Sequence, residues 1–245
     1  MAEADWSELS NSLVSGNVAR GVTAGISPPN GGGSFVYGFN SLSASPGAVG
    51  KYVNATGNPN FAPMQTTGPV ATGGSIRGVM QRGVSAEPQI GFAPMLFMHV
   101  KTGLTSSPDV NDVGYLLGLE DANPHRIVLR KGSLAGGLTV DTTQSTLRVS
   151  AAAFTAGTWI QLRLDCIFNL NGDVVLKVFQ NDLNSNPVSA PVWTAVAGMA
   201  DFIDDSLGVN SGSSPLSGGF CGYGFFVKDL QRRSYFDQIE ILRQL

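Results

Sequence analysis

The sequence predicts an all-β protein folded as an antiparallel β-sandwich. Short apolar segments separated by turn residues recur from Ser75 onward, and no long helical patterns alternate with them. The clearest signal is a hairpin at 158–181, in which apolar and polar residues alternate on both sides of Asn171-Gly172. That dipeptide tolerates the positive φ angles of a tight turn, so we expect two paired strands with one face in a core and the other in water.

The N-terminal segment has an amphipathic pattern. Trp6, Leu9 and Leu13 recur at helical intervals, and Asp5 with Glu8 has the spacing of a capping box. We expect a short helix or arm here. Because a helix of this length is marginal in water, it either docks on a partner or folds back on its own domain. We interpret the three apolar residues as candidate partner contacts.

A region rich in Gly, Pro, Ser and Asn extends over 15–75. Its strongest break begins at Pro28-Pro29, and we interpret these two prolines as further candidate partner contacts. Alternating aromatic residues predict a short strand at 34–40. The remainder, 41–74, is expected to be a long surface loop without regular structure. Loops of that kind are usually functional or disordered, and contact with another chain is the interpretation we prefer.

The second half of the chain reads as one strand after another. The apolar run at 92–101 predicts a central strand, and a short turn or helix is expected near 199–205. We expect one domain over 21–245, preceded by the arm at 1–20. Besides the hairpin, the expected strands after Ser75 are 76–84, 92–101, 112–120, 125–131, 147–151, 192–196, 220–228 and 235–242.

Composition excludes several classes of function. Charged residues make up 13% of the chain, about half of the usual share, so the surface is either neutral or partly covered by neighbouring subunits. A net charge of −3 argues against a nucleic-acid partner. No apolar run is long enough to span a membrane, and the first residues lack the basic region of a secretory signal.

Motifs that carry catalysis or bind cofactors are missing. The sequence has no Gly-x-Ser-x-Gly turn, phosphate-binding loop or His-Glu-x-x-His. His99 and His125 have no metal-ligand partner at a suitable spacing and are expected to be structural. Cys166 and Cys221 lie in expected strands, so we expect buried free thiols. A disulfide would require the two strands to face each other closely. We expect no cofactor and no metal.

Two groups of acidic residues need separate treatment. Asp237 and Glu240 are the candidate pair for glycoside hydrolysis, but three residues apart on a strand they are expected on opposite faces. Asp109, Asn111 and Asp112 carry oxygen ligands of the kind that Ca²⁺ prefers, and the same residues are favoured in turns. We therefore expect a protein that is not an enzyme.

Several segments resemble known families. Three segments form the hairpin and the last expected strand: GTWIQLRLD (157–165), NGDVVLKVF (171–179) and RSYFDQIEI (233–241). They resemble the corresponding strands of concanavalin A-like and laminin G-like sandwiches. Three further segments come earlier in the chain: GYLLGLED (114–121), PHRIVLRKGSL (124–134) and GVTAGISPPNGGGSFVY (21–37). They are similar to a family of tailed-bacteriophage virion proteins.

The resemblance implies a concanavalin A-like jelly roll in a structural protein of the phage particle. Such a protein is expected in capsid decoration, the neck or the tail, within a virion assembled in the host bacterial cytoplasm. Its partners would be other virion proteins and further copies of itself, with a trimer as the expected assembly because symmetric particles favour closed symmetry. The alternative is a carbohydrate-binding module that adheres to host cell-surface glycans.

Overall fold

The structure is a computed structural model that describes most of the second half of the chain and separate strands of the first half. Its described backbone comprises residues 6–8, 13–15, 34–39, 48–53, 60–66, 69–71, 73–82, 92–101, 113–120, 124–133, 145–187, 190–227 and 233–244. Side chains are described at 69–71, 73–82, 94–101, 113–120, 124–133, 146–187, 190–224 and 239–244. Within these ranges no helix is long and apolar enough to cross a membrane.

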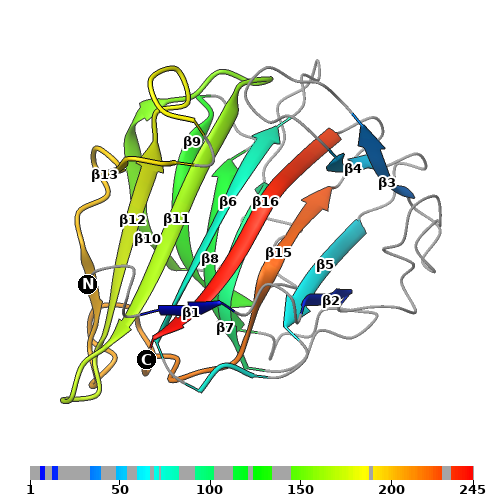
Figure 1. Ribbon diagram of the computed structural model, residues 1–245. Coiled ribbons are helices and arrows are strands. Elements are labelled where there is room, and N and C mark those ends of the chain that lie inside the picture. Colours follow the sequence, from blue (N-terminus) through cyan, green and yellow to red (C-terminus); the bar gives the residue numbers. More distant parts are fainter. Residues whose placement is uncertain are drawn as a thin grey trace.

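Two antiparallel sheets lie face to face and form a sandwich (Figure 1). Sheet A runs in the order β13 (Trp193–Ala195), β12 (Val174–Asn181), β11 (Trp159–Phe168), β6 (Gly74–Arg82), β16 (Arg233–Gln244), β4 (Ala48–Val53) and β3 (Ser34–Phe39). In addition, β14 (Phe202–Asp204) pairs with β12, and β1 (Trp6–Glu8) pairs with β16. Sheet B runs in the order β10 (Ser145–Ala153), β9 (Arg126–Ser133), β8 (Val113–Glu120), β7 (Phe92–Val100), β15 (Phe220–Val227), β5 (Asn60–Thr66) and β2 (Leu13–Ser15).

The predicted sandwich and most of its strands are confirmed. The hairpin at 158–181 is β11 paired with β12, and the apolar run at 92–101 is β7, the middle strand of sheet B. The expected loop at 41–74 is wrong in part, because it contains β4 and β5. The segment near 199–205 forms strand β14 where a turn or helix was expected. In both cases pairing with a neighbouring strand supplies hydrogen bonds that local propensity does not reveal.

The N-terminal helix is wrong for the residues described. Trp6 lies in β1, opposite Gln244 in sheet A, and Leu13 lies in β2, opposite Thr66 in sheet B. The two residues therefore belong to different sheets and do not share one helical face. A short isolated helix gains little in water, whereas the edge of a sheet offers unpaired backbone donors and acceptors. Leu9, Pro28 and Pro29 lie outside the described residues.

The main core lies between the two sheets. Inward-facing residues of β6, β11 and β12 meet those of β7, β8 and β9, and Leu162, Leu164 and Leu117 are fully buried. Cys166 and Cys221 belong to the same core as buried free thiols, as predicted. Burying a large apolar side chain such as leucine stabilises the fold by about 1.5–3 kcal/mol. A second cluster on the other face of sheet B buries Met95, Phe97, Val100, Leu116 and Val128.

The polar face of β11 is buried, which contradicts the expectation that it faces water. Gln161, Arg163 and Asp165 are only 3%, 8% and 3% exposed. Arg163 donates two hydrogen bonds to the Asp165 carboxylate, at 2.7 and 2.9 Å, and Gln161 accepts one from Asn181 at 2.7 Å. These groups remain buried at low cost because each finds a partner on the same face.

Strand β16 contains a bulge between Asp237 and Glu240. Asp237 pairs with Val79 and Glu240 pairs with Arg77, so three residues of β16 span two of β6. Glu240 is held by Arg77, whose guanidinium donates to its carboxylate at 2.7 and 3.0 Å. The side chain of Asp237 lies outside those described, so the expected placement of the two carboxylates on opposite faces stays a prediction.

A buried polar cluster joins the two sheets. The carboxylate of Asp204 on β14 accepts hydrogen bonds from Tyr115 on β8 and from Ser211, and it forms an ion pair of 2.7 Å with Lys131 on β9. The ammonium of Lys131 also donates to Ser211 Oγ and to the carbonyl oxygens of Ser213 and Ser214, each at 2.8 Å. The segment that follows β14 is therefore attached to both sheets.

Burial governs the ionisation of this cluster. Asp204 is fully buried, and Lys131 is 3% exposed. Burial raises the pKa of Tyr115 far above its ordinary value, and the hydrogen bond to Asp204 adds to the effect. Burial also lowers the pKa of Lys131, while the Asp204 carboxylate opposes that change. Removing one partner would leave the other charge buried and unpaired, which is costly.

We expect Lys131→Met to lower the free energy of unfolding by about 3–5 kcal/mol, because it leaves the Asp204 carboxylate buried without a counter-ion. Denaturant unfolding monitored by tryptophan fluorescence measures the change. The matched control is Lys177→Met, since Lys177 pairs with Asp201 at 2.8 Å with side chains that are 35% and 55% exposed. The control should change stability by less than about 1 kcal/mol. Equal losses in the two variants would contradict the role of the buried cluster.

Candidate functional site

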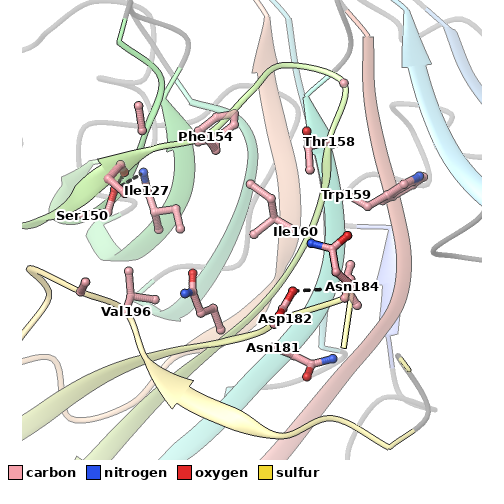
Figure 2. A pocket seen from close by; sticks show the side chains of 16 residues that line it. Ile127, Ser150, Phe154, Thr158, Trp159, Ile160, Asn181, Asp182, Asn184 and Val196 are labelled. Atoms are coloured by element: carbon pink, nitrogen blue, oxygen red, sulfur yellow. Dashed lines mark hydrogen bonds between the residues drawn. The ribbon is translucent and has the colours of Figure 1, made fainter. Parts of the chain in front are cut away.

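A cleft of about 530 Å³ opens at the end of the sandwich where β11 begins and β12 ends (Figure 2). Because this hairpin is antiparallel, the start of β11 and the end of β12 lie side by side, and Gln161 is paired with Asn181. Trp159 and Ile160 therefore lie close to the loop that begins at Asp182. Ile127 of β9, the end of β10 and the segment after β13 also contribute to the lining.

The turn that leads into β11 is held by sheet A. Gln81 on β6 donates through Nε2 to the carbonyl of Gly157 at 2.7 Å, and the Gly157 amide donates to the carbonyl of Arg82 at 2.8 Å. Gly157 has φ of 84°, a left-handed conformation that glycine adopts at little cost. Phe154 precedes this turn, and its ring packs against His125 at 5.5 Å between centroids. These contacts set the positions of Phe154 and Trp159.

The segment after β13 joins the edges of the two sheets. The Ala151 amide on β10 donates to the Ala197 carbonyl at 2.7 Å. Gly198 has φ of 84°, and a Cβ at this position would lie 2.6 Å from the Ala151 nitrogen, so a side chain is excluded. Arg148 strengthens the junction by donating to the carbonyl of Ala200 at 2.9 Å. Val196 and Ala197 are thereby held in the lining of the cleft.

Asn181 positions the loop that follows β12. Its side-chain amide donates to Gln161 Oε1 at 2.7 Å and to the Asn186 carbonyl at 3.3 Å. Its oxygen accepts a hydrogen bond from the Val192 amide at 3.0 Å. Asn181 is 4% exposed, so we assign it a structural role. The exposed residues of the loop, Asp182 and Asn184, present polar groups to the cleft (Figure 2).

Asp182 is the one charged residue among the described residues of the lining. Its carboxylate accepts hydrogen bonds from the Ser185 hydroxyl at 2.7 Å and from the Asn184 amide at 3.0 Å. The Ser185 hydroxyl, followed by the Asn184 amide, lowers the pKa of Asp182 below its ordinary value. The group is therefore an ionised hydrogen-bond acceptor near neutral pH, and its orientation is fixed by the turn.

The lining combines apolar and hydrogen-bonding groups. Phe154, Trp159, Ile160 and Leu183 supply apolar surface. Ser150, Thr158, Gln180, Asn181, Asp182 and Asn184 supply polar groups. Within the part of the chain that the structure describes, no three His, Cys, Asp or Glu residues come together in a way that could hold a metal ion. The arrangement can bind a small polar molecule that also has apolar faces.

The structure describes the backbone of two of the candidate contacts from the sequence. Trp6 and Leu13 lie in strands of different sheets, their side chains are not among those described, and their role as partner contacts stays a prediction. The candidate calcium ligands Asp109, Asn111 and Asp112, like Leu9, Pro28 and Pro29, fall outside the described residues. His99 contacts the rings of Tyr115 and Phe168, and His125 contacts Arg82.

The sequence did contain a signal for the cleft. In an antiparallel hairpin, the residues before the first strand and those after the second lie at the same end. The segments Gly157-Thr158-Trp159 and Asp182-Leu183-Asn184 are therefore neighbours as soon as the hairpin is recognised. The contribution of β10 and Val196 to the lining depends on how sheet B packs against sheet A, and no local sequence pattern predicts it.

Comparison with solved structures identifies the fold. The metal-free exoplasmic/luminal domain of VIP36 has a TM-score of 0.54 at 14% identity, over 98% of this chain and 94% of that chain. The same domain bound to Ca²⁺ and mannose has a TM-score of 0.53 at 13% identity, over 98% and 92%. The PL-14 alginate lyase from Aplysia kurodai has a TM-score of 0.54 at 12% identity, over 86% and 87%.

At these identities the likeness shows the fold alone, a concanavalin A-like β-sandwich, as the sequence resemblance implied. No protein-family profile and no curated protein sequence matches the chain.

Replacing Ser185 by Ala should raise the pKa of Asp182 towards its ordinary value of 3.8, because the hydroxyl is the largest cause of the lowering. NMR titration of the Asp182 carboxyl carbon measures this shift. Since the folded pKa lies below the unfolded value, Asp182 stabilises the fold above the unfolded pKa and loses that contribution as pH falls through the folded pKa. Ser206→Ala, at the far end of the sandwich, should leave the titration unchanged. An unaltered Asp182 titration in Ser185→Ala would contradict the assigned hydrogen bond.

Proposed function

We propose that this protein is a non-catalytic carbohydrate-binding module and that the cleft beside Trp159 and Asp182 is its sugar site. The observation that carries the proposal is the lining, which places apolar side chains next to hydroxyl, amide and carboxylate groups. A sugar ring presents the matching surfaces, because its C–H faces are apolar and its hydroxyl groups form directional hydrogen bonds.

The shared fold supports the proposal. One of the similar structures, VIP36, is described with mannose bound, so a sandwich of this kind is compatible with sugar binding. Fold alone does not establish function. The argument therefore rests on the cleft of this chain, where Asp182 and Asn184 present hydrogen-bonding groups on an exposed loop.

The cleft gives no support to a lyase or a hydrolase. The similar alginate lyase acts on a polysaccharide, but the described lining of this cleft contains no Tyr, His, Lys or Arg. Glycoside hydrolysis needs a protonated acid beside a second carboxylate, whereas Asp182 is the one carboxylate among the described lining residues and its pKa is lowered. Binding without cleavage is the chemistry that these residues favour.

The virion role rests on the sequence resemblance alone. The comparisons give no support to a capsid, neck or tail component, to a trimer or to a phage particle as the location. These stay predictions of the sequence. Sugar binding is compatible with them, because a module on a particle surface could recognise host glycans.

We expect Leu183→Ala and Asn184→Ala each to weaken glycan binding by about five- to tenfold, since each removes one apolar or hydrogen-bonding contact at the cleft. A glycan array followed by isothermal titration with the best ligand measures the loss. Leu170→Ala is the control, because Leu170 is a fully exposed apolar residue in the turn at the opposite end of the hairpin. An array without any bound glycan, or an equal loss in the control, would contradict the proposal.

A further inference from the structure

The charge of the cleft is unbalanced. Asp182 provides the one formally charged group among the described residues that line it, and the other polar lining groups are hydroxyls and amides. The carboxylate is exposed to water, and two hydrogen bonds hold it in place. Because its pKa is lowered, it is ionised near neutral pH. A ligand in the cleft therefore meets a fixed negative charge.

Two arginines near the cleft are engaged by backbone carbonyl groups. Arg126 donates to the carbonyl oxygens of Ser150 and Ala151 at 2.6 and 2.8 Å. Arg148 donates to the carbonyl oxygens of Leu147 and Ala200 at 2.8 and 2.9 Å. Neither arginine lines the cleft. An acidic ligand would thus lose hydration of its carboxylate without gaining a cation from the described lining residues to replace it.

We infer that the cleft selects neutral sugars and rejects sugars that carry a carboxylate, and that Asp182 determines this specificity. The inference rests on the proposed function and deepens it, because it names the class of glycan. Two like charges at contact distance repel each other, and added salt screens the repulsion. A neutral sugar instead donates its hydroxyl groups to the Asp182 carboxylate as charge-assisted hydrogen bonds.

The test uses matched pairs of oligosaccharides that differ only in oxidation of the exocyclic carbon. Oligosaccharides of mannose, glucose and galactose are compared with those of mannuronate, glucuronate and galacturonate, at equal length and linkage. Isothermal titration with the full chain measures each affinity at low and at high salt. For the sugar that binds, we expect the uronate to bind at least about tenfold more weakly at low salt, with a smaller difference at high salt.

Asp182→Asn isolates the charge, because its amide oxygen can accept the hydrogen bond from the Asn184 backbone amide while its amide nitrogen donates to the Ser185 hydroxyl. We expect the ratio of neutral to acidic affinity to fall by about tenfold in this variant and to lose its dependence on salt. Asp205→Asn is the matched control, since Asp205 lies at the opposite end of the sandwich and is bonded to backbone amides there. The control should keep the wild-type ratio, and thermal unfolding verifies that both variants are folded.

The outcomes separate the inference from the proposed function. Preference for the neutral member, reduced by Asp182→Asn and by salt, supports the inference. Equal or tighter binding of the uronate overturns it while leaving sugar binding intact, as does a preference that Asp182→Asn does not alter. If neither member of any pair binds and a broader array is also negative, the proposed function fails and the inference falls with it.

Discussion

The carboxylate of Asp204 is the point at which the two sheets depend on each other. It lies on β14, which pairs with β12 of sheet A, and its partners Tyr115 and Lys131 lie on β8 and β9 of sheet B. The same cluster binds the chain after β14, through Ser211 and through the Leu216 amide, which donates to the Tyr115 hydroxyl at 3.0 Å. Apolar packing between sheets is not directional, whereas the hydrogen bonds and the ion pair of this cluster form only in one relative position of the two sheets. We regard it as the interaction that sets the register of one sheet over the other at this end of the sandwich.

The hairpin of β11 and β12 connects that cluster to the cleft. At one end, β12 pairs with β14, which contains Asp204. At the other end, β12 finishes at Asn181, whose amide fixes the loop carrying Asp182. The backbone pairing between β11 and β12 is continuous from Gln161 to Phe168. The cleft therefore lies at the end of a continuously paired hairpin, and the exposed loop that carries the Asp182 carboxylate extends from that end.

The strands of the second half were predictable because their signals are local. Alternation over 160–168 and the turn at Asn171-Gly172 specify a hairpin without reference to any other part of the chain. Strands β4, β5 and β14 were missed because their sequences are rich in turn-forming residues or lack regular alternation. Such segments form strands only when a neighbouring strand supplies backbone hydrogen bonds. The helical interpretation of the N-terminal segment failed for the same reason, since β1 and β2 obtain their hydrogen bonds from β16 and β5.

The sequence by itself determined the class of fold, the central position of β7 and the hairpin that brings Trp159 and Asp182 to one end. Those features follow from residue polarity and turn chemistry, which are properties of short segments. Only the tertiary structure decided that Gln161, Arg163 and Asp165 are buried, because polarity does not say whether a polar face meets water or other polar groups. It also decided that β10 and Val196 close the cleft, since residues distant in sequence meet only after the two sheets have packed.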